Sequence, residues 1–150
     1  MASSQYQTVC GLTPANVARE AREKYWSLRN TEPKIAWGNL DASTQNRWID
    51  AVESLFVKCE RQMSLSAASA TAGFVDGILG RGAFEKLPPA NRLLWEAVLR
   101  HAVMLIMAGE PGATRNELDQ EIAEAREYDW GKWLEKKAME TNLQETVNAK

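Results

Sequence analysis

Apolar residues recur at helical spacing along most of the chain. The stretches 13–30, 41–63, 88–108 and 114–138 carry them three or four positions apart, which places them on one face of an α-helix. A further helix is expected over the small-residue stretch 64–80. No segment alternates apolar and polar residues as a half-buried strand would. We therefore predict an all-α fold, a single-domain bundle of about five helices.

The predicted helices begin at residues that cap helices. Thr13, Asp41 and Thr114 each precede an apolar stripe, and a side-chain oxygen at that position accepts a hydrogen bond from a free N–H group of the first turn. Thr114 and Glu117 also have the spacing of a capping box. Gly131 lies inside the last stripe, so we expect it to kink or split that helix.

One spacing occurs twice: an aromatic residue, Leu three positions later, and Trp eight positions after that. The copies are Trp37, Leu40 and Trp48, and, at an offset of 47 residues, Phe84, Leu87 and Trp95. Apolar residues after the shared Trp keep the same register. A duplicated helical hairpin explains this repeat, and so does independent use of the same chemistry at two helix starts. Either way, the repeat predicts how the chain turns into a buried helix.

The length of 150 residues fits one domain with its own core. We predict a flexible N-terminus over 1–12, a helical domain over 13–140 and a loose tail over 141–150. The first ten residues do not resemble a signal peptide. Two cysteines do not form a disulfide framework, which favours a reducing compartment. We expect a cytoplasmic protein, in the host cytoplasm if a phage encodes it, without membrane association.

The sequence gives little support for metal binding, phosphate binding or catalysis, each of which needs several residues at a set spacing. His101 is the single histidine and has no cysteine or histidine at ligand spacing, so neither a metal nor another cofactor is predicted. Gly80-Arg81-Gly82 lacks the Lys and the Ser or Thr of a phosphate loop. A small hydrolase with paired carboxylates remains an alternative. Its candidates are Glu20, Glu23, Glu110, Glu117 and Glu121.

Three tryptophans lie outside the repeat and fit their helical stripes less well. Tryptophan is enriched where one protein binds another. Because the net charge of −2 is close to neutral and no catalytic set is evident, we expect another protein as the partner. The predicted partner-binding residues are Trp26, Trp130 and Trp133.

A second alternative is nucleic-acid binding by the first helix. Cations contact phosphates and aromatic rings stack on bases, and this helix interleaves both kinds of residue. Glu20 and Glu23 reduce its positive field. The candidate residues are Arg19, Arg22, Lys24, Tyr25 and Arg29.

The stretch 117–129 is strongly acidic, whereas lysines follow it. That order complements a helix dipole, and a row of carboxylates is also what a protein imitating the charge of DNA presents. The stretch 93–108 is apolar on nearly all sides. Such a helix is covered either by the rest of its domain or by a second copy. We therefore predict a homo-oligomer, with a two-fold dimer favoured.

The segments 36–40 with 47–52, and 84–89 with 95–98, resemble a pattern in small proteins of tailed phages and prophages. In that pattern an aromatic-x-x-Leu-Pro turn leads into a helix with Trp and Ala-Val. The resemblance implies a phage accessory protein, and no catalytic residue carries over. The sequence thus predicts a non-enzymatic protein that binds another protein, with inhibition of a host or defence component as one such role.

Overall fold

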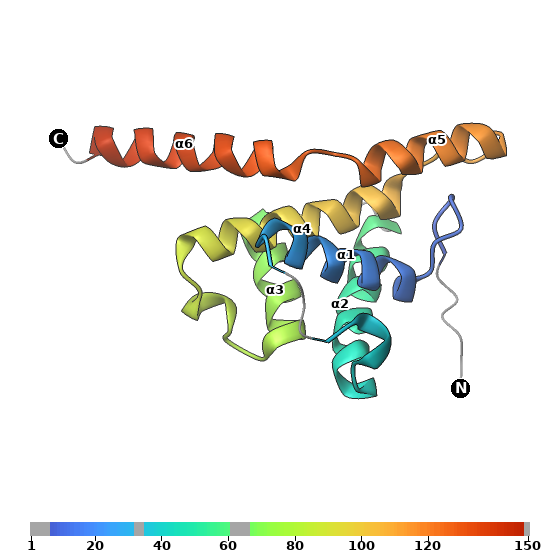
Figure 1. Cartoon of the computed structure of the whole chain (residues 1–150), viewed down its shortest axis with the longest axis horizontal. Helices are drawn as coiled ribbons and strands as arrows, with labels where there is room; N and C mark the ends of the chain where they lie inside the picture. The colour runs from blue at the N-terminus through green and yellow to red at the C-terminus, as the bar shows by residue number, and fades with distance from the viewer. Residues whose placement is uncertain (1–6, 32–34, 61–66, 149–150) are drawn as a thin grey trace.

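The computed structural model describes residues 7–31, 35–60 and 67–148, and over these residues the chain is all-helical without strands (Figure 1). The predicted helical bundle is confirmed, with six α-helices in place of about five. The elements are α1 (Pro14–Leu28), η1 (Trp37–Asn39), α2 (Ala42–Glu60), α3 (Ala67–Leu79), η2 (Phe84–Lys86), α4 (Pro89–Met107), α5 (Arg115–Arg126) and α6 (Trp130–Asn148), where η denotes a 3₁₀ turn.

Helices α1 to α4 form a bundle around one core. Helix α1 packs against α2 and α4, and α3 packs against the same two helices from the other side. Val17, Val52, Val75 and Val98 come from the four helices in turn, and each is fully buried. The apolar stripes of the sequence therefore meet in one place.

Helix α4 is the centre of the molecule. It contacts each of the other five α-helices, and α5 and α6 follow one another along its outer side (Figure 1). Most of its apolar side chains are consequently buried by the chain itself, whereas Leu93, Leu94, Val103 and Met104 are half-buried and Met107 is 66% exposed. The need for outside cover, which motivated the predicted homodimer, is therefore largely met within one molecule. The dimer itself stays a prediction.

The repeat seen in the sequence has a counterpart in the backbone. In each copy the Leu N–H group donates to the carbonyl of the aromatic residue three positions earlier, from Leu40 to Trp37 and from Leu87 to Phe84, both at 3.1 Å. A 19-residue helix follows each turn, and the starts of α2 and α4 are also 47 residues apart. The motif thus closes a 3₁₀ turn that leads the chain into a long helix.

One further pair of equivalent positions braces these turns. Gln45 Nε2 donates to the carbonyl of Trp37 at 2.7 Å. Arg92, 47 residues later, donates from Nε to the carbonyl of Leu87 at 3.0 Å and from Nη2 to that of Glu85 at 2.7 Å. The shared tryptophans Trp48 and Trp95 contact one another, with ring centroids 5.6 Å apart. The two hairpins are therefore alike in structure, whether they arose by duplication or by convergence.

The predicted N-cap residues are confirmed, but the reciprocal bonds of a capping box join Thr13 and Asn16, whereas the Glu117 carboxylate accepts from the Thr114 hydroxyl. The side chains of Thr13, Asp41 and Thr114 accept hydrogen bonds from backbone N–H groups in the first turns of α1, α2 and α5. The last predicted helix is split into α5 and α6, but at residues 127–129 and not at Gly131. The cause is Asp129, whose carboxylate accepts from the N–H group of Lys132 and so starts a new helix.

The two predicted loose ends are partly covered by the structure. The predicted flexible stretch 1–12 extends over residues 1–6, which lie outside the described residues, and over 7–12, which include buried side chains. Thr8 and Cys10 are buried, and the N–H group of Thr8 donates to the carbonyl of Leu12 at 2.9 Å. The predicted tail over 141–150 is helical as far as Asn148. The stretch 132–148 contains no Gly or Pro, so nothing in its composition ends the helix.

Candidate functional site

An open cleft of about 460 Å³ lies between the end of α4 and helix α5. Its lining comes from α4 and the loop after it, with Met104 and Met107, and from α5 and the residue Tyr128 beyond it. Met107 is 66% exposed and Tyr128 is 42% exposed. We call this feature the α4–α5 cleft. It is concave and open to solvent, and we call the apolar part of its lining, Met104, Met107 and Tyr128, its floor.

Three carboxylates also line the α4–α5 cleft: Glu110 on one wall, and Glu121 and Glu124 on the other. No Lys or Arg lines it. None of the three forms an ion pair with a described residue. The nearby arginines are engaged elsewhere, because Arg115 pairs with Asp119 and Arg126 pairs with Glu20. The cleft therefore carries uncompensated negative charge.

The shape of this cleft depends on a crowded junction beneath it. Gly109 has φ of +89°, and a Cβ atom there would lie 2.7 Å from Leu118 Cδ2 and 3.0 Å from Cys10 Sγ. Cys10 is buried, and its single S–H donor is shared between the carbonyls of Ala108 and Leu118, at 3.4 and 3.5 Å from Sγ. Glycine is required here both by its backbone conformation and by the close approach. The junction sets the angle at which α5 leaves α4.

A smaller hollow of about 260 Å³ lies on the other side of Met107. It is mainly apolar and is lined by Val9, Phe56, Cys59 and Ile106 together with that methionine. Burial raises the pKa of the Cys59 thiol, which keeps it protonated and a weak nucleophile. The exposed side chain of Met107 thus stands between two concave surfaces.

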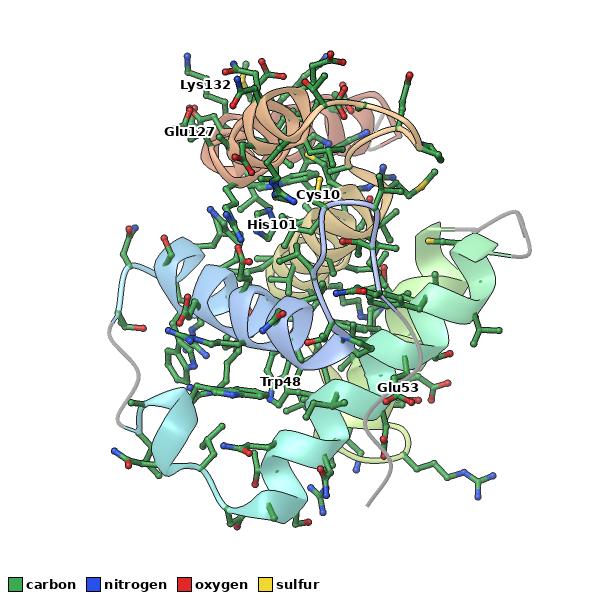
Figure 2. The ribbon with its side chains drawn as sticks, turned by 90° about the vertical axis from the view of Figure 1, so that its right-hand side faces the viewer. Cys10, Trp48, Glu53, His101, Glu127 and Lys132 are labelled. Carbon is green, nitrogen blue, oxygen red and sulfur yellow. The ribbon has the colours of Figure 1, made fainter. Side chains whose placement is uncertain are left out.

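Trp130 is not on the surface, contrary to what its predicted partner-binding role requires. It is 4% exposed, and its Nε1–H group donates to Nδ1 of buried His101 at 3.2 Å. Figure 2 shows His101 between the outer helices and the bundle. Burial, followed by the charges of Lys24 and Arg126, lowers the pKa of His101 to about 4. The histidine is therefore neutral at pH 7 and acts as the acceptor that fixes the start of α6.

The other two predicted partner-binding tryptophans are half-buried. Arg100 and Lys137 approach the ring of Trp133, at 5.4 and 5.7 Å from its centroid. Trp26 packs edge-on against Tyr25, with centroids 5.4 Å apart. They lie on different helices, α6 and α1, and neither lines the α4–α5 cleft. A partner-binding role for Trp26 and Trp133 stays a prediction.

The predicted basic face of the first helix is not a single exposed surface. Arg22 is 7% exposed, and its Nη2 atom donates to the carbonyl of Ile35 at 2.8 Å; its burial lowers the pKa of the guanidinium. Arg19 pairs with Glu23. The remaining candidates are also held by neighbours or partly covered: Arg29 donates to the hydroxyl of Tyr25 at 2.7 Å, and Lys24 is half-buried. Arg22 in particular is a structural residue.

The carboxylates of the hydrolase alternative are distributed over three places. Glu20 accepts two hydrogen bonds from Arg126, both at 2.9 Å, and Glu23 accepts from Arg19. Glu117 belongs to the first turn of α5, where it contacts Thr114. Glu20 and Glu23 line a hollow of about 430 Å³ together with Arg19 and Arg126, whereas Glu110 and Glu121 both line the α4–α5 cleft.

Metal-site and membrane geometries are absent from the described part of the chain. Across residues 7–31, 35–60 and 67–148, no three His, Cys, Asp or Glu residues group in a way that would hold a metal ion. No helix within those same residues is both long and apolar enough to cross a membrane.

Comparison with other proteins adds no relative. No protein family, curated protein or solved structure matches the chain. The α4–α5 cleft is thus the main candidate site on the geometry of this molecule alone. Sequence reasoning missed its apolar members Met104, Met107 and Tyr128, and the one available signal was a methionine directly before the glycine-containing turn that ends α4.

Proposed function

We propose that this protein is a non-enzymatic, phage-type accessory protein that binds another protein through the α4–α5 cleft. The observation that carries the proposal is the exposure of Met107 and Tyr128 at a concave surface. Large apolar side chains exposed together and rimmed by polar groups mark protein interaction sites. Methionine suits such a surface because its flexible side chain adapts to different partners.

The state of three titratable side chains favours binding over catalysis. The imidazole of His101 is buried and accepts from Trp130. The thiol of Cys10 donates to backbone carbonyls, and Glu20 is held by Arg126. Each of these groups serves a contact within the molecule, so none is left free to act as a nucleophile or a general base.

The resemblance of the two turns to phage proteins suggests where the partner belongs. Inhibition of a host or defence component would place the protein in the cytoplasm of its host, and it is a role that needs binding alone. Both hairpins carry the turn as a structural part of the bundle, so the resemblance bears on origin and not on the binding surface.

The test uses two methionines of equal exposure. Met107, in the cleft, is 66% exposed, and Met139, on α6 and outside the cleft, is 65% exposed. We expect the wild-type protein and Met139→Glu to capture the same stoichiometric protein from a host lysate. Met107→Glu should capture at least about tenfold less of that protein, because the complex would have to remove the new carboxylate from water. Circular dichroism checks that both variants remain helical.

Three results would remove this proposal. Equal capture by Met107→Glu and Met139→Glu would place the contact elsewhere on the molecule. Capture of nucleic acid alone, in a manner that weakens steeply with salt, would favour the nucleic-acid alternative. Turnover of a substrate by the purified protein would favour the hydrolase.

A further inference from the structure

We infer that the segment bound by the α4–α5 cleft is a cationic amphipathic peptide segment, in which an apolar anchor side chain is flanked by Lys or Arg. This inference rests on the proposed function and adds the chemical class of the partner. It combines two properties of one surface, the exposed apolar floor and the charge of the walls.

The floor requires an apolar anchor. Met104 and Met107 lie one helical turn apart on α4, and Tyr128 faces the same hollow from beyond the end of α5. An inserted aliphatic or aromatic side chain would displace water from these three groups, which is favourable because apolar area leaves the solvent. A purely polar segment would remove less apolar area from water and would therefore bind less favourably.

The walls select the charge of the residues beside the anchor. Glu110 stands on the α4 side, and Glu121 and Glu124 lie three positions apart on α5, so carboxylates occupy both sides of the floor. Glu124 accepts a hydrogen bond from Gln120 at 2.9 Å, which satisfies only part of one carboxylate. A neutral segment covering the cleft would remove water from three charges without replacing it.

Neighbouring cations within the molecule do not relieve that charge. Arg126 donates from Nε and Nη2 to Glu20 on α1, and Arg115 is paired with Asp119. An acidic segment would be repelled, whereas Lys or Arg on the partner would form ion pairs with the free carboxylates. Charge complementarity therefore favours a cationic segment over a neutral or acidic one.

The experiment measures binding of two synthetic peptides to the full-length protein. Both are 16-residue amphipathic helices with leucine at helical spacing; one carries lysine at the remaining positions and the other carries glutamate. We expect the lysine peptide to bind at least about tenfold more tightly than the glutamate peptide, and its affinity to fall as salt rises from about 0.05 to about 0.5 M.

Matched charge reversals locate the effect. Glu121→Lys with Glu124→Lys changes two carboxylates three positions apart in the cleft. The control is Asp50→Lys with Glu53→Lys, which makes the same change with the same spacing on α2. Figure 2 shows Glu53 far from Glu127 at the end of α5. We expect the cleft pair of substitutions to weaken binding of the lysine peptide at least about tenfold more than the control pair does.

The outcomes separate this inference from the proposed function. If both peptides bind equally and both lose binding with Met107→Glu, the cleft binds protein segments and the cationic inference is overturned. If neither peptide depends on Met107, the cleft is not a docking surface and the inference also fails. If the free protein sediments as a dimer that Met107→Glu dissociates, a second copy occupies the cleft and the inference is overturned.

Discussion

The bundle of α1 to α4 and the outer pair α5 and α6 are held by different kinds of contact. Each bundle helix packs against at least two other bundle helices, whereas α5 and α6 pack mainly against α4 (Figure 1). In the bundle, Tyr25, Trp48, Phe74 and Trp95 form one cluster of contacting rings. The bundle is thus stabilised by the burial of a large apolar surface.

The outer pair depends more on directional contacts. Trp130 donates to His101, the Cys10 thiol donates to the carbonyl of Leu118, and Arg126 donates to Glu20. Such bonds specify position, and each has a small net effect on the free energy of unfolding. The difference teaches that the outer pair, which bears part of the candidate cleft, is positioned by a few side chains, while the bundle is held by many apolar contacts.

The largest expected effect comes from the bundle. Trp95 is 1% exposed and contacts both Trp48 and Phe74. We expect Trp95→Ala to lower the free energy of unfolding by roughly 3–5 kcal/mol, because it leaves a cavity at the centre of the ring cluster. Urea denaturation measures this change. The same substitution at half-buried Trp133, on α6, should cost less, and an equal cost would contradict the contrast between the two regions.

Acid should destabilise the contact between the bundle and the outer pair, where His101 lies. The pKa of His101 is about 4 in the folded protein against an ordinary value of 6.5, since burial disfavours the charged ring. The unfolded chain therefore binds the proton first. The free energy of unfolding is therefore highest above pH 6.5. It falls by roughly 3 kcal/mol as the pH drops towards 4, because the unfolded chain takes up the proton there and the folded chain does not.

The test of this pH dependence uses the single histidine. Its ring signals in proton NMR should not titrate in the folded protein until the pH approaches 4. His101→Gln keeps an acceptor for Trp130 and removes the titration, so its stability should decline less between pH 6.5 and 4. A histidine that titrates near 6.5 would show that it is not enclosed as described.

A smaller and more local effect is expected for Trp130→Phe. This change keeps most of the ring and removes the N–H donor, which leaves Nδ1 of His101 buried without that partner. We expect a loss of about 1–3 kcal/mol. Hydrogen exchange should quicken in α6 more than in α2 or α3. Uniform quickening throughout the bundle would mean that the two regions unfold as one unit.

The smallest effect is expected at the ion pair between α5 and α1. Arg126 and Glu20 have side chains 46% and 22% exposed, so water and salt weaken their attraction. Arg126→Gln should change the free energy of unfolding by less than about 1 kcal/mol in thermal or urea denaturation. A larger loss would show that this one pair fixes the position of α5.

Sequence reasoning recovered the bundle better than the outer pair. Helical spacing and cap chemistry are local properties, which is why Thr13, Asp41 and Thr114 were assigned correctly. Burial of single side chains is set by contacts distant in sequence. Arg22 turns inward to a carbonyl 13 residues away, and Trp130 to a histidine 29 residues away. Neither partner could be read from helical spacing.

The cleft was missed for the same reason. Its walls come from two consecutive helices, and the turn between them places Met107 opposite Tyr128. The acidic residues of α5 were visible as a pattern, but their position beside exposed methionines depends on the angle set at Gly109. The apolar and charged parts of the surface are separate features in sequence and one feature in space.

The attachment of α6 near one end has a mechanical consequence. Its contacts to α4 include Trp130 and Trp133 in its first two turns, whereas the helix continues to Asn148. A 19-residue helix is about 28 Å long. Pivoting it by about 10° at the attached end would move the far end by about 5 Å, simply from that length. A small rotation of α6 at the hydrogen bond between Trp130 and His101 would therefore become a displacement of several ångströms at its far end.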